Sequence, residues 1–242
     1  MSFKEAAAEI IREMTKDADW IREPLVGFAD VSSPKIRELK ASVAKDHLLP
    51  EDVLPEATII LSYFLPFTRE AGDCNKEGDF PSQRWADLYN ATNALIAEIN
   101  DALVSRLQEA GIAAAVPAGG FDTELLMSRW SQRHIAEAAG LGTFGLNNML
   151  ITRVGSMGRY GSVVTALKEP ADLPETTERC LAKAGGKCRV CIERCPTGAL
   201  TEDGFNRKAC YVICKKAEEE LGADVCGKCA VAVPCAVIAE KH

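Results

Sequence analysis

The cysteines are the most reactive residues of this chain, and nearly all of them stand in its C-terminal part. Nine of the ten lie at or after Cys180. In reducing surroundings thiols stay free, so cysteines crowded in this way point to metal binding before disulfides. The centre of the region reads GGKCRVCIERCPTGAL, in which Cys188, Cys191 and Cys195 precede a proline. This spacing predicts thiolate ligands for iron–sulfur clusters.

The motif matches the bacterial ferredoxin pattern CxxCxxCxxxCP at three of its four cysteines. In that pattern the closely spaced cysteines wrap one [4Fe–4S] cube, and the cysteine before proline crosses to a second cube. Gly185 stands where the first cysteine would be, and Cys180 is the nearest substitute. Further ligands are available downstream at Cys210, Cys214, Cys226, Cys229 and Cys235.

Two cubes need eight thiolates, and the crossing pattern divides the cysteines between them. We assign one cluster to Cys180, Cys188, Cys191 and Cys235. We assign the other cluster to Cys195, Cys210, Cys226 and Cys229. Two cysteines remain, Cys74 and Cys214, and Cys214 is a rival for one of the assigned places.

A zinc site and structural free thiols are the alternatives to the clusters. Two CxxC pairs, at Cys188 and Cys226, could supply the four thiolates of a tetrahedral zinc ion. The CxxxCP motif, the TGAL that follows it, and the surplus of cysteines over one zinc ion favour iron–sulfur instead.

The elements that must position these cysteines are visible in the hydrophobic pattern. Apolar residues at helical spacing predict helices over Phe3–Lys16 and Gln83–Ala110, the second ended by Gly111. Ser33 and Pro34 predict a helix start that continues to Asp46. The apolar, β-branched stretch Ala57–Pro66 predicts a buried strand.

The rest of the chain is predicted from shorter signals. Residues 67–82 form a polar loop, and Ile112–Pro117 a short strand. A helix is predicted over Thr123–Ala139. Met149–Arg153 and Ser162–Leu167 read as two strands joined by a glycine-rich turn. The proline-containing acidic stretch Glu169–Thr177 is the best linker, which predicts an α/β (α+β) domain over 1–170 and a small ferredoxin-like domain over 171–242.

Composition limits the class of protein. The chain has 242 residues, 47% of them hydrophobic and 26% charged, and no apolar run long enough to cross a bilayer. Its N-terminus lacks the pattern of a secretion signal, so we expect a cytoplasmic protein without membrane contact. The formal net charge of −7 would repel a phosphate backbone, so no nucleic-acid partner is expected.

The stretch His134–Thr165, HIAEAAGLGTFGLNNMLITRVGSMGRYGSVVT, resembles the epoxyqueuosine reductase family and its relatives, the cobalamin-dependent reductive dehalogenases. The later CPTGA and the lone cysteine before a CxxC pair follow in the family's order. The resemblance implies a nitroreductase-like α/β domain that holds a corrinoid, beside two [4Fe–4S] clusters that feed it electrons. A flavin in place of the corrinoid is the alternative that such a fold suggests.

The resemblance also implies cofactor contacts in the glycine-rich string, where a missing Cβ would let the backbone approach a corrin ring. The residues concerned are Gly140, Gly142, Gly145, Gly155, Ser156, Gly158, Arg159, Tyr160 and Gly161. Helix caps and tight turns would explain most of these glycines equally well.

Two residues are candidates for catalysis. Asp122, followed by Thr123, resembles the family's catalytic Asp-Thr pair, although it lies about one helical turn too far from the glycine motif; an N-cap is the simpler role. His134 could donate a proton near neutral pH, or could be a hydrogen-bonded helix histidine.

These observations predict an iron–sulfur oxidoreductase that reduces a small organic substrate through the corrinoid, supplied by an electron donor. The family is longer, with helical repeats after the clusters that help hold tRNA. Only seven residues follow Cys235, so we expect a short form that does not reduce tRNA. The alternative is a non-catalytic electron-transfer protein that docks to a redox partner.

Overall fold

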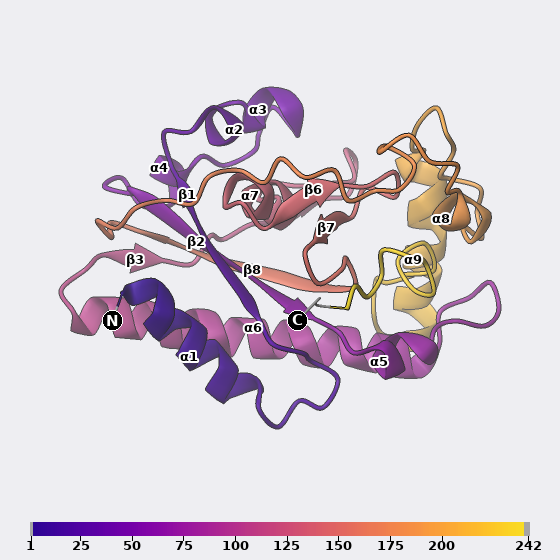
Figure 1. Cartoon of the computed structure of the whole chain (residues 1–242), viewed down its shortest axis with the longest axis horizontal. Coiled ribbons are helices and arrows are strands. Elements are labelled where there is room, and N and C mark those ends of the chain that lie inside the picture. Colours follow the sequence, from indigo (N-terminus) through magenta and orange to yellow (C-terminus); the bar gives the residue numbers. More distant parts are fainter. Residues whose placement is uncertain (1, 240–242) are drawn as a thin grey trace.

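The centre of the fold is a four-stranded antiparallel sheet. The computed structural model describes residues 2–239. The strands follow the order β1-β2-β8-β3, with β1 at Leu25–Asp30, β2 at Ile59–Pro66, β8 at Gly158–Thr165 and β3 at Ala114–Ala115 (Figure 1). Every residue of β2 is buried, as expected for a central strand covered on both faces. The predicted mixed helix and sheet fold class is therefore confirmed.

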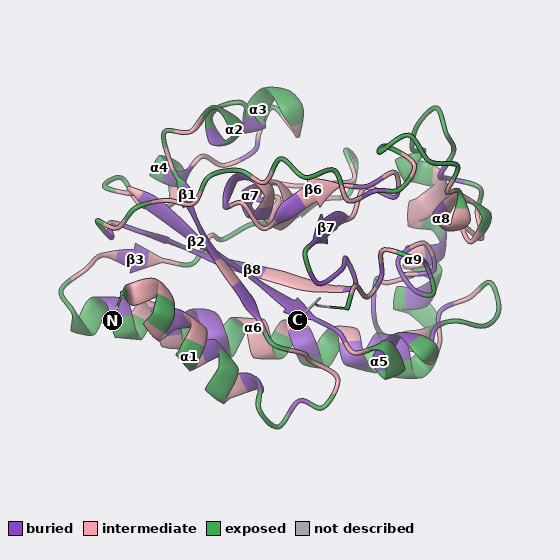
Figure 2. Cartoon of the chain, viewed as in Figure 1, coloured by how far each residue is buried: buried purple, intermediate pink, exposed green. Residues whose placement is uncertain are grey.

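Helices cover both faces of this sheet. Leu61 and Tyr63 of β2 point to the face covered by α1 (Phe3–Thr15) and α6 (Gln83–Glu109). Ile60 points to the opposite face, against α7 (Gln132–Ala138). The alternation follows from the two-residue period of a strand. Figure 2 shows the result as buried strands between helices whose outer surfaces are exposed.

The short elements complete these two layers. Beyond the sheet lie the helices α2 (Pro34–Arg37), α3 (Leu39–Ser42), α4 (Pro50–Val53) and α5 (Arg69–Asp73). Two small hairpins pair β4 (Phe121–Asp122) with β5 (Met127–Ser128) and β6 (Gly142–Phe144) with β7 (Leu150–Thr152). No helix among residues 2–239 is both long and apolar enough to span a bilayer.

The cysteine-rich part lies at the end of the molecule remote from the N-terminus, and contains α8 (Val190–Glu193) and α9 (Arg207–Leu221) (Figure 1). It shares a hydrophobic cluster with the sheet part, in which Trp85 and Met157 pack with Cys191 and Val231. The predicted linker is also anchored, since Asp172 accepts hydrogen bonds from Lys4 Nζ at 2.5 Å and from the backbone N–H of Phe28 at 2.7 Å.

Several predicted elements are confirmed and others are wrong. The helices at α1 and α6 and the strand at β2 lie where the sequence pattern placed them. The helix predicted from Pro34 to Asp46 is broken into α2 and α3, and the loop 67–82 contains α5. The strand predicted over Ile112–Pro117 is reduced to β3.

The helix predicted over Thr123–Ala139 is wrong in its first half. A hairpin occupies residues 121–128, and the helix α7 begins only at Gln132. The Asp122 carboxylate accepts hydrogen bonds from the backbone N–H groups of Glu124 and Leu125, each at 2.8 Å. An aspartate that bonds its own backbone in this way offers the chain a turn in place of a helix.

Gly161 lies on β8 opposite Tyr63 of β2, where these two central strands pack closely. A Cβ added to Gly161 would lie 2.2 Å from Cζ of the fully buried Tyr63. We expect Gly161→Ala to lower the free energy of unfolding by about 1–3 kcal/mol, because the core must move to admit the methyl group. The control is Gly204→Ala, where nothing lies within 4 Å of the added Cβ. Equal urea midpoints for the two variants would contradict this packing.

Candidate metal centre

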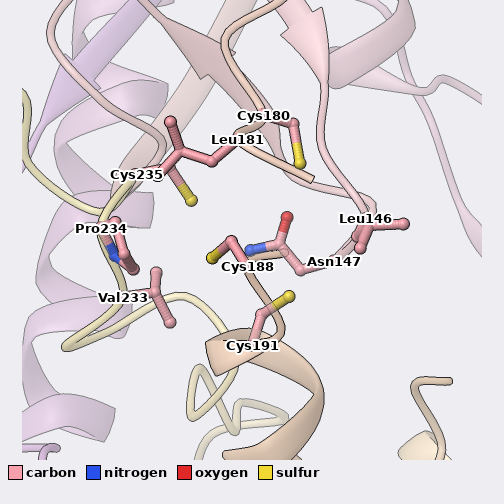
Figure 3. Close-up of a pocket in the computed structure, with 9 residues that line it drawn as sticks. All are labelled: Leu146, Asn147, Cys180, Leu181, Cys188, Cys191, Val233, Pro234 and Cys235. Atoms are coloured by element: carbon pink, nitrogen blue, oxygen red, sulfur yellow. The ribbon is translucent and has the colours of Figure 1, made fainter. Parts of the chain in front are cut away.

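Four cysteines line one cavity in the C-terminal part. Cys180, Cys188, Cys191 and Cys235 surround about 330 Å³ of space, including its opening to solvent. Figure 3 shows the four sulfur atoms around this space. The rest of the lining is apolar apart from one amide, and consists of Leu146, Asn147, Leu181, Val233 and Pro234. The structure thus brings together the four cysteines that the sequence assigned to the first cluster, which we name the first thiol group.

The turn at Gly155 and Ser156 holds the most distant cysteine of this group in place. The backbone N–H and the hydroxyl of Ser156 donate to the carbonyl oxygen of Cys235 at 2.9 and 3.1 Å. A Cβ on Gly155 would lie 2.3 Å from the carbonyl oxygen of Ala236, so only glycine permits this approach. The turn therefore docks the C-terminal segment and fixes the position of Cys235.

The second assigned set, Cys195, Cys210, Cys226 and Cys229, is named the second thiol group. Cys195 and Cys229 pack against the same hydrophobic cluster. Burial raises the pKa of both Cys226 and Cys229, and the charges of Cys210 and Cys195 add to that shift. Cys210 lies on α9, and the loop after that helix carries Cys226 and Cys229. Asn75 and Asn147 hold this loop by donating to the carbonyl oxygens of Cys226 and Cys229 at 2.8 and 2.9 Å.

Burial is the largest influence on the titration of these thiols. Together with the charges of neighbouring cysteines, it raises the pKa of Cys226 to about 11, of Cys229 to about 12 and of Cys235 to about 11. Thiols with such values are protonated at neutral pH. Because a metal binds the thiolate, loading iron at these sites must release protons.

The two cysteines left over by the sequence assignment have different surroundings. Cys74 donates a hydrogen bond to the carbonyl oxygen of Ala71 at 3.0 Å and packs among apolar side chains. Cys214 lies one turn after Cys210 on α9 and is hydrogen-bonded to it, which raises the pKa of Cys214 and lowers that of Cys210. Cys214 is therefore a neighbour of the second thiol group, whereas Cys74 belongs to neither group.

The thiols are spread around a space and do not converge on one point. In the described residues, 2–239, no three His, Cys, Asp or Glu side chains are placed to hold a single metal ion. A structural zinc ion would need four ligands at about 2.0–2.3 Å from its centre. The first thiol group lines a cavity, which suits a cluster of several atoms.

The glycines predicted to approach a cofactor approach the chain itself. At each of them an added Cβ would come within 3 Å of a protein atom, such as the Leu173 carbonyl oxygen for Gly140 and the Ile151 carbonyl oxygen for Gly142. Gly145 packs on the Ile151 side chain, and Gly158 on the Leu65 carbonyl oxygen. Contacts within the fold thus account for these glycines.

The predicted polar contacts are also engaged within the chain. Tyr160 donates its hydroxyl to the Leu150 carbonyl oxygen at 3.0 Å and stacks on Phe64, with ring centroids 4.4 Å apart. The Arg159 guanidinium lies 4.1 Å from the centre of the Tyr89 ring. Ser156, which holds Cys235, these two residues and the glycines thus all have contacts within the fold, and their contact with a corrinoid or a flavin stays a prediction.

The two predicted catalytic residues, Asp122 and His134, each have their own hydrogen-bond partners within the chain. Asp122 closes the hairpin turn between β4 and β5. His134, on α7, has Nδ1 2.7 Å from the Ser131 hydroxyl and its ring against Phe144. Burial lowers the pKa of His134 to about 4, and the Arg133 charge adds to the shift. His134 is therefore neutral at pH 7 and is not the imidazolium that acid catalysis near neutrality needs.

Two cations beside the second thiol group, the half-buried Arg133 and the buried Lys228, were not predicted from the sequence. Arg133 donates to the carbonyl oxygen of Asn148, and burial lowers its pKa. Lys228, between Cys226 and Cys229, is 1% exposed. The presence of Lys228 inside a CxxC motif was the one signal that could have indicated it.

Comparisons with known proteins agree with the resemblance in the sequence. No family model matches the chain. An epoxyqueuosine reductase of Listeria monocytogenes is 28% identical over 177 residues, which are 69% of this chain and 43% of that protein. One of Bacillus subtilis is 27% identical over 169 residues, 66% of this chain and 40% of that protein. The matched region thus spans less than half the length of these relatives.

Solved structures share the fold. A Bacillus subtilis epoxyqueuosine reductase, with its catalytic aspartate loop swung out of the active site, superposes with a TM-score of 0.59 at 18% identity, over 97% of this chain and 66% of that one. The catabolic reductive dehalogenase NpRdhA gives 0.59 at 16% identity, over 90% of this chain and 30% of that one. The resemblance to the epoxyqueuosine reductase family is confirmed, at modest identity.

One further neighbour bears on the expected partners. An epoxyqueuosine reductase bound to a tRNA stem loop superposes with a TM-score of 0.58 at 19% identity, over 97% of this chain and 66% of that one. That protein binds nucleic acid, which conflicts in part with the expectation of no nucleic-acid partner drawn from the net charge.

His134 gives a pH-dependent test of this site. Its folded-state pKa of about 4 lies below the ordinary value near 6.5, so the unfolded chain binds the proton first. Its contribution to stability is therefore complete above about pH 6.5 and is lost as the pH falls toward 4. We expect the His134 ring signals in an NMR titration to stay unchanged from pH 8 to 5.5 in the folded protein. The urea-unfolded chain is the control, and a folded midpoint near 6.5 would contradict the burial argument.

Proposed function

We propose that this chain is an iron–sulfur oxidoreductase related to the epoxyqueuosine reductases, in which eight cysteines hold two [4Fe–4S] clusters. The observation that carries the proposal is the separation of these cysteines into two groups of four, the first of which lines a cavity. The groups mix cysteines that are far apart in sequence, since Cys235 joins Cys188 and Cys191, and Cys195 joins Cys226. This crossing is the ligand arrangement of two-cluster ferredoxins.

The clusters would supply single electrons to an acceptor at the N-terminal part. The second thiol group borders that part, where Asn147 bonds the Cys229 carbonyl oxygen and the Arg133 charge acts on Cys210. An acceptor on this side would stand a short distance from the second group. The electrons would come from an external donor protein or reductant, and the substrate would be a small organic molecule.

A corrinoid is the acceptor that the family implies, with a flavin as the alternative. When bound, a corrinoid would supply a cobalt centre that low-potential electrons can reduce. The glycine-rich string from Gly140 to Gly161 packs against the chain itself, so its contact with either cofactor rests on the family resemblance. We derive no step through the cofactor.

The second candidate function is an electron-transfer protein without a substrate of its own. Three observations favour it. Asp122 is committed to a turn, His134 is neutral at pH 7, and the predicted cofactor contacts are filled by the fold. In this function the sheet part would be a docking module for a redox partner.

Substitution of single cysteines tests whether the two thiol groups bind the two clusters. We expect anaerobically reconstituted protein to hold about eight iron atoms and eight acid-labile sulfides per chain. Cys235→Ala removes one ligand of the first thiol group and should lower both contents to about half. Cys74→Ala is the matched control and should leave both contents unchanged, because Cys74 belongs to neither group. Protein that binds zinc and no iron after reconstitution would refute the proposal.

Titration with a corrinoid separates the two candidate functions. Reconstituted protein is mixed with hydroxocobalamin, and binding is followed by the visible absorption of the corrin and by equilibrium dialysis. The oxidoreductase function predicts saturable binding of about one corrinoid per chain. Protein that keeps its clusters and binds neither corrinoid nor flavin would leave the electron-transfer function as the one supported.

A further inference from the structure

Lys228 is a buried cation that forms no ion pair with a carboxylate of residues 2–239. Its side chain lies within the CxxC motif of the second thiol group and is 1% exposed. Its Nζ donates to the backbone carbonyl oxygens of Asn75 and Glu77, at 2.9 and 2.7 Å. Across the part of the chain that the structure describes, it forms no salt bridge.

A buried ammonium group needs an anion nearby. Removing a charge from water costs several kcal/mol even after relaxation, and two carbonyl dipoles offset only part of that cost. Cys226 and Cys229 are the neighbours of Lys228 in sequence, and among the anionic groups that act on Lys228 the Cys226 thiolate has the largest effect, ahead of Asp79 and Cys74. Asp79 is exposed, so the anion that can balance the buried charge is a thiolate bound to iron. A cubane held by four thiolates carries a net negative charge, which grows by one when the cluster is reduced.

We propose that Lys228 is the charge partner of the cluster held by the second thiol group, and that it makes this cluster easier to reduce than the first. The inference rests on the proposed function, since it requires both clusters. A fixed positive charge beside a cluster stabilises the reduced form more than the oxidised form, which raises the reduction potential.

The two thiol groups differ in their charged surroundings. The first cavity is lined by apolar side chains and the Asn147 amide, without a charged residue. Near its mouth Arg189 is paired with Glu202, and Lys183 donates to the Phe144 carbonyl oxygen at 2.7 Å. These cations have partners outside the cavity.

The second group has several cations around it. Besides Lys228, the charges of Arg133 on α7 and Arg207 at the start of α9 act on Cys210. Asp224, on the loop after α9, opposes them, since its charge acts on Cys214. The surplus of positive charge therefore lies beside the second group, and Lys228 is the fully buried member of it.

Lys228 also holds a loop, and this structural role must be separated from the electrostatic one. Arg194 provides the comparison, because it fixes the same loop from another position. Its guanidinium donates to the carbonyl oxygens of Lys76 at 2.8 Å and Lys228 at 3.2 Å. Loss of either cation loosens the loop, but only Lys228 is fully buried inside the motif.

The test is a redox titration of the reconstituted full chain followed by electron paramagnetic resonance. The wild type should show two clusters with different midpoint potentials. We expect Lys228→Met to move the higher potential to a more negative value and to leave the lower one unchanged. Lys228→Arg, which keeps the charge, should stay near the wild type. Arg194→Met, the loop control, should move the potential less than Lys228→Met does, because Arg194 is only half-buried. In the Cys235→Ala background the remaining cluster should be the one that shifts.

Each outcome decides the inference. Unchanged potentials in Lys228→Met, equal shifts of both clusters, or the same shift in Arg194→Met would overturn it. If Lys228→Met loses about half of its iron, restoration by Lys228→Arg supports a charge partner, and loss in both variants overturns it. Iron and sulfide analysis of the wild type distinguishes the two failures, because a wild type without clusters refutes the proposed function itself.

Discussion

The docking of the C-terminal segment on the turn at Gly155 and Ser156 is the contact on which the metal centre depends. The first thiol group is complete only when Cys235 reaches three cysteines that lie more than forty residues earlier in the chain. Ser156 fixes the Cys235 carbonyl oxygen, and the missing side chain of Gly155 leaves room for Ala236. The glycine-rich string and the cysteine motifs, which are separate in the sequence, therefore form one structural unit.

This unit joins the cysteine-rich part to the sheet part. Trp85 of α6 and Met157 beside β8 pack against Cys191 and Val231, so the sheet and the metal centre share one hydrophobic cluster. Further hydrogen bonds cross between the parts, including that from Tyr89 to Asp224 at 2.7 Å. Disturbing either part should therefore disturb the other.

The sequence predicted those features that local spacing determines. The grouping of the cysteines follows from the short spacings and the crossing pattern, and α6 follows from an uninterrupted helical period. The first half of the helix predicted over Thr123–Ala139 was wrong because the Asp122 carboxylate accepts hydrogen bonds from two backbone N–H groups. The hydrophobic period of the sequence does not reveal such a turn. The glycines show a further limit. A glycine in the sequence indicates that another group approaches the backbone closely. It does not indicate whether that group is a cofactor or, as at Gly155, the Ala236 carbonyl oxygen of the chain itself.

Charge placement is the other property that spacing did not reveal. The chain is acidic overall, yet it places the half-buried Arg133 and the fully buried Lys228 beside the second thiol group. Neither cation has a described carboxylate partner, and both bond to backbone carbonyl oxygens. Buried charges of this kind are costly unless an anion balances them. Thiolates bound to iron would provide that anion, so the cations and the cysteines are best understood as parts of one electrostatic arrangement. The apolar first cavity has no such arrangement, and the two sites would therefore differ in their affinity for an electron.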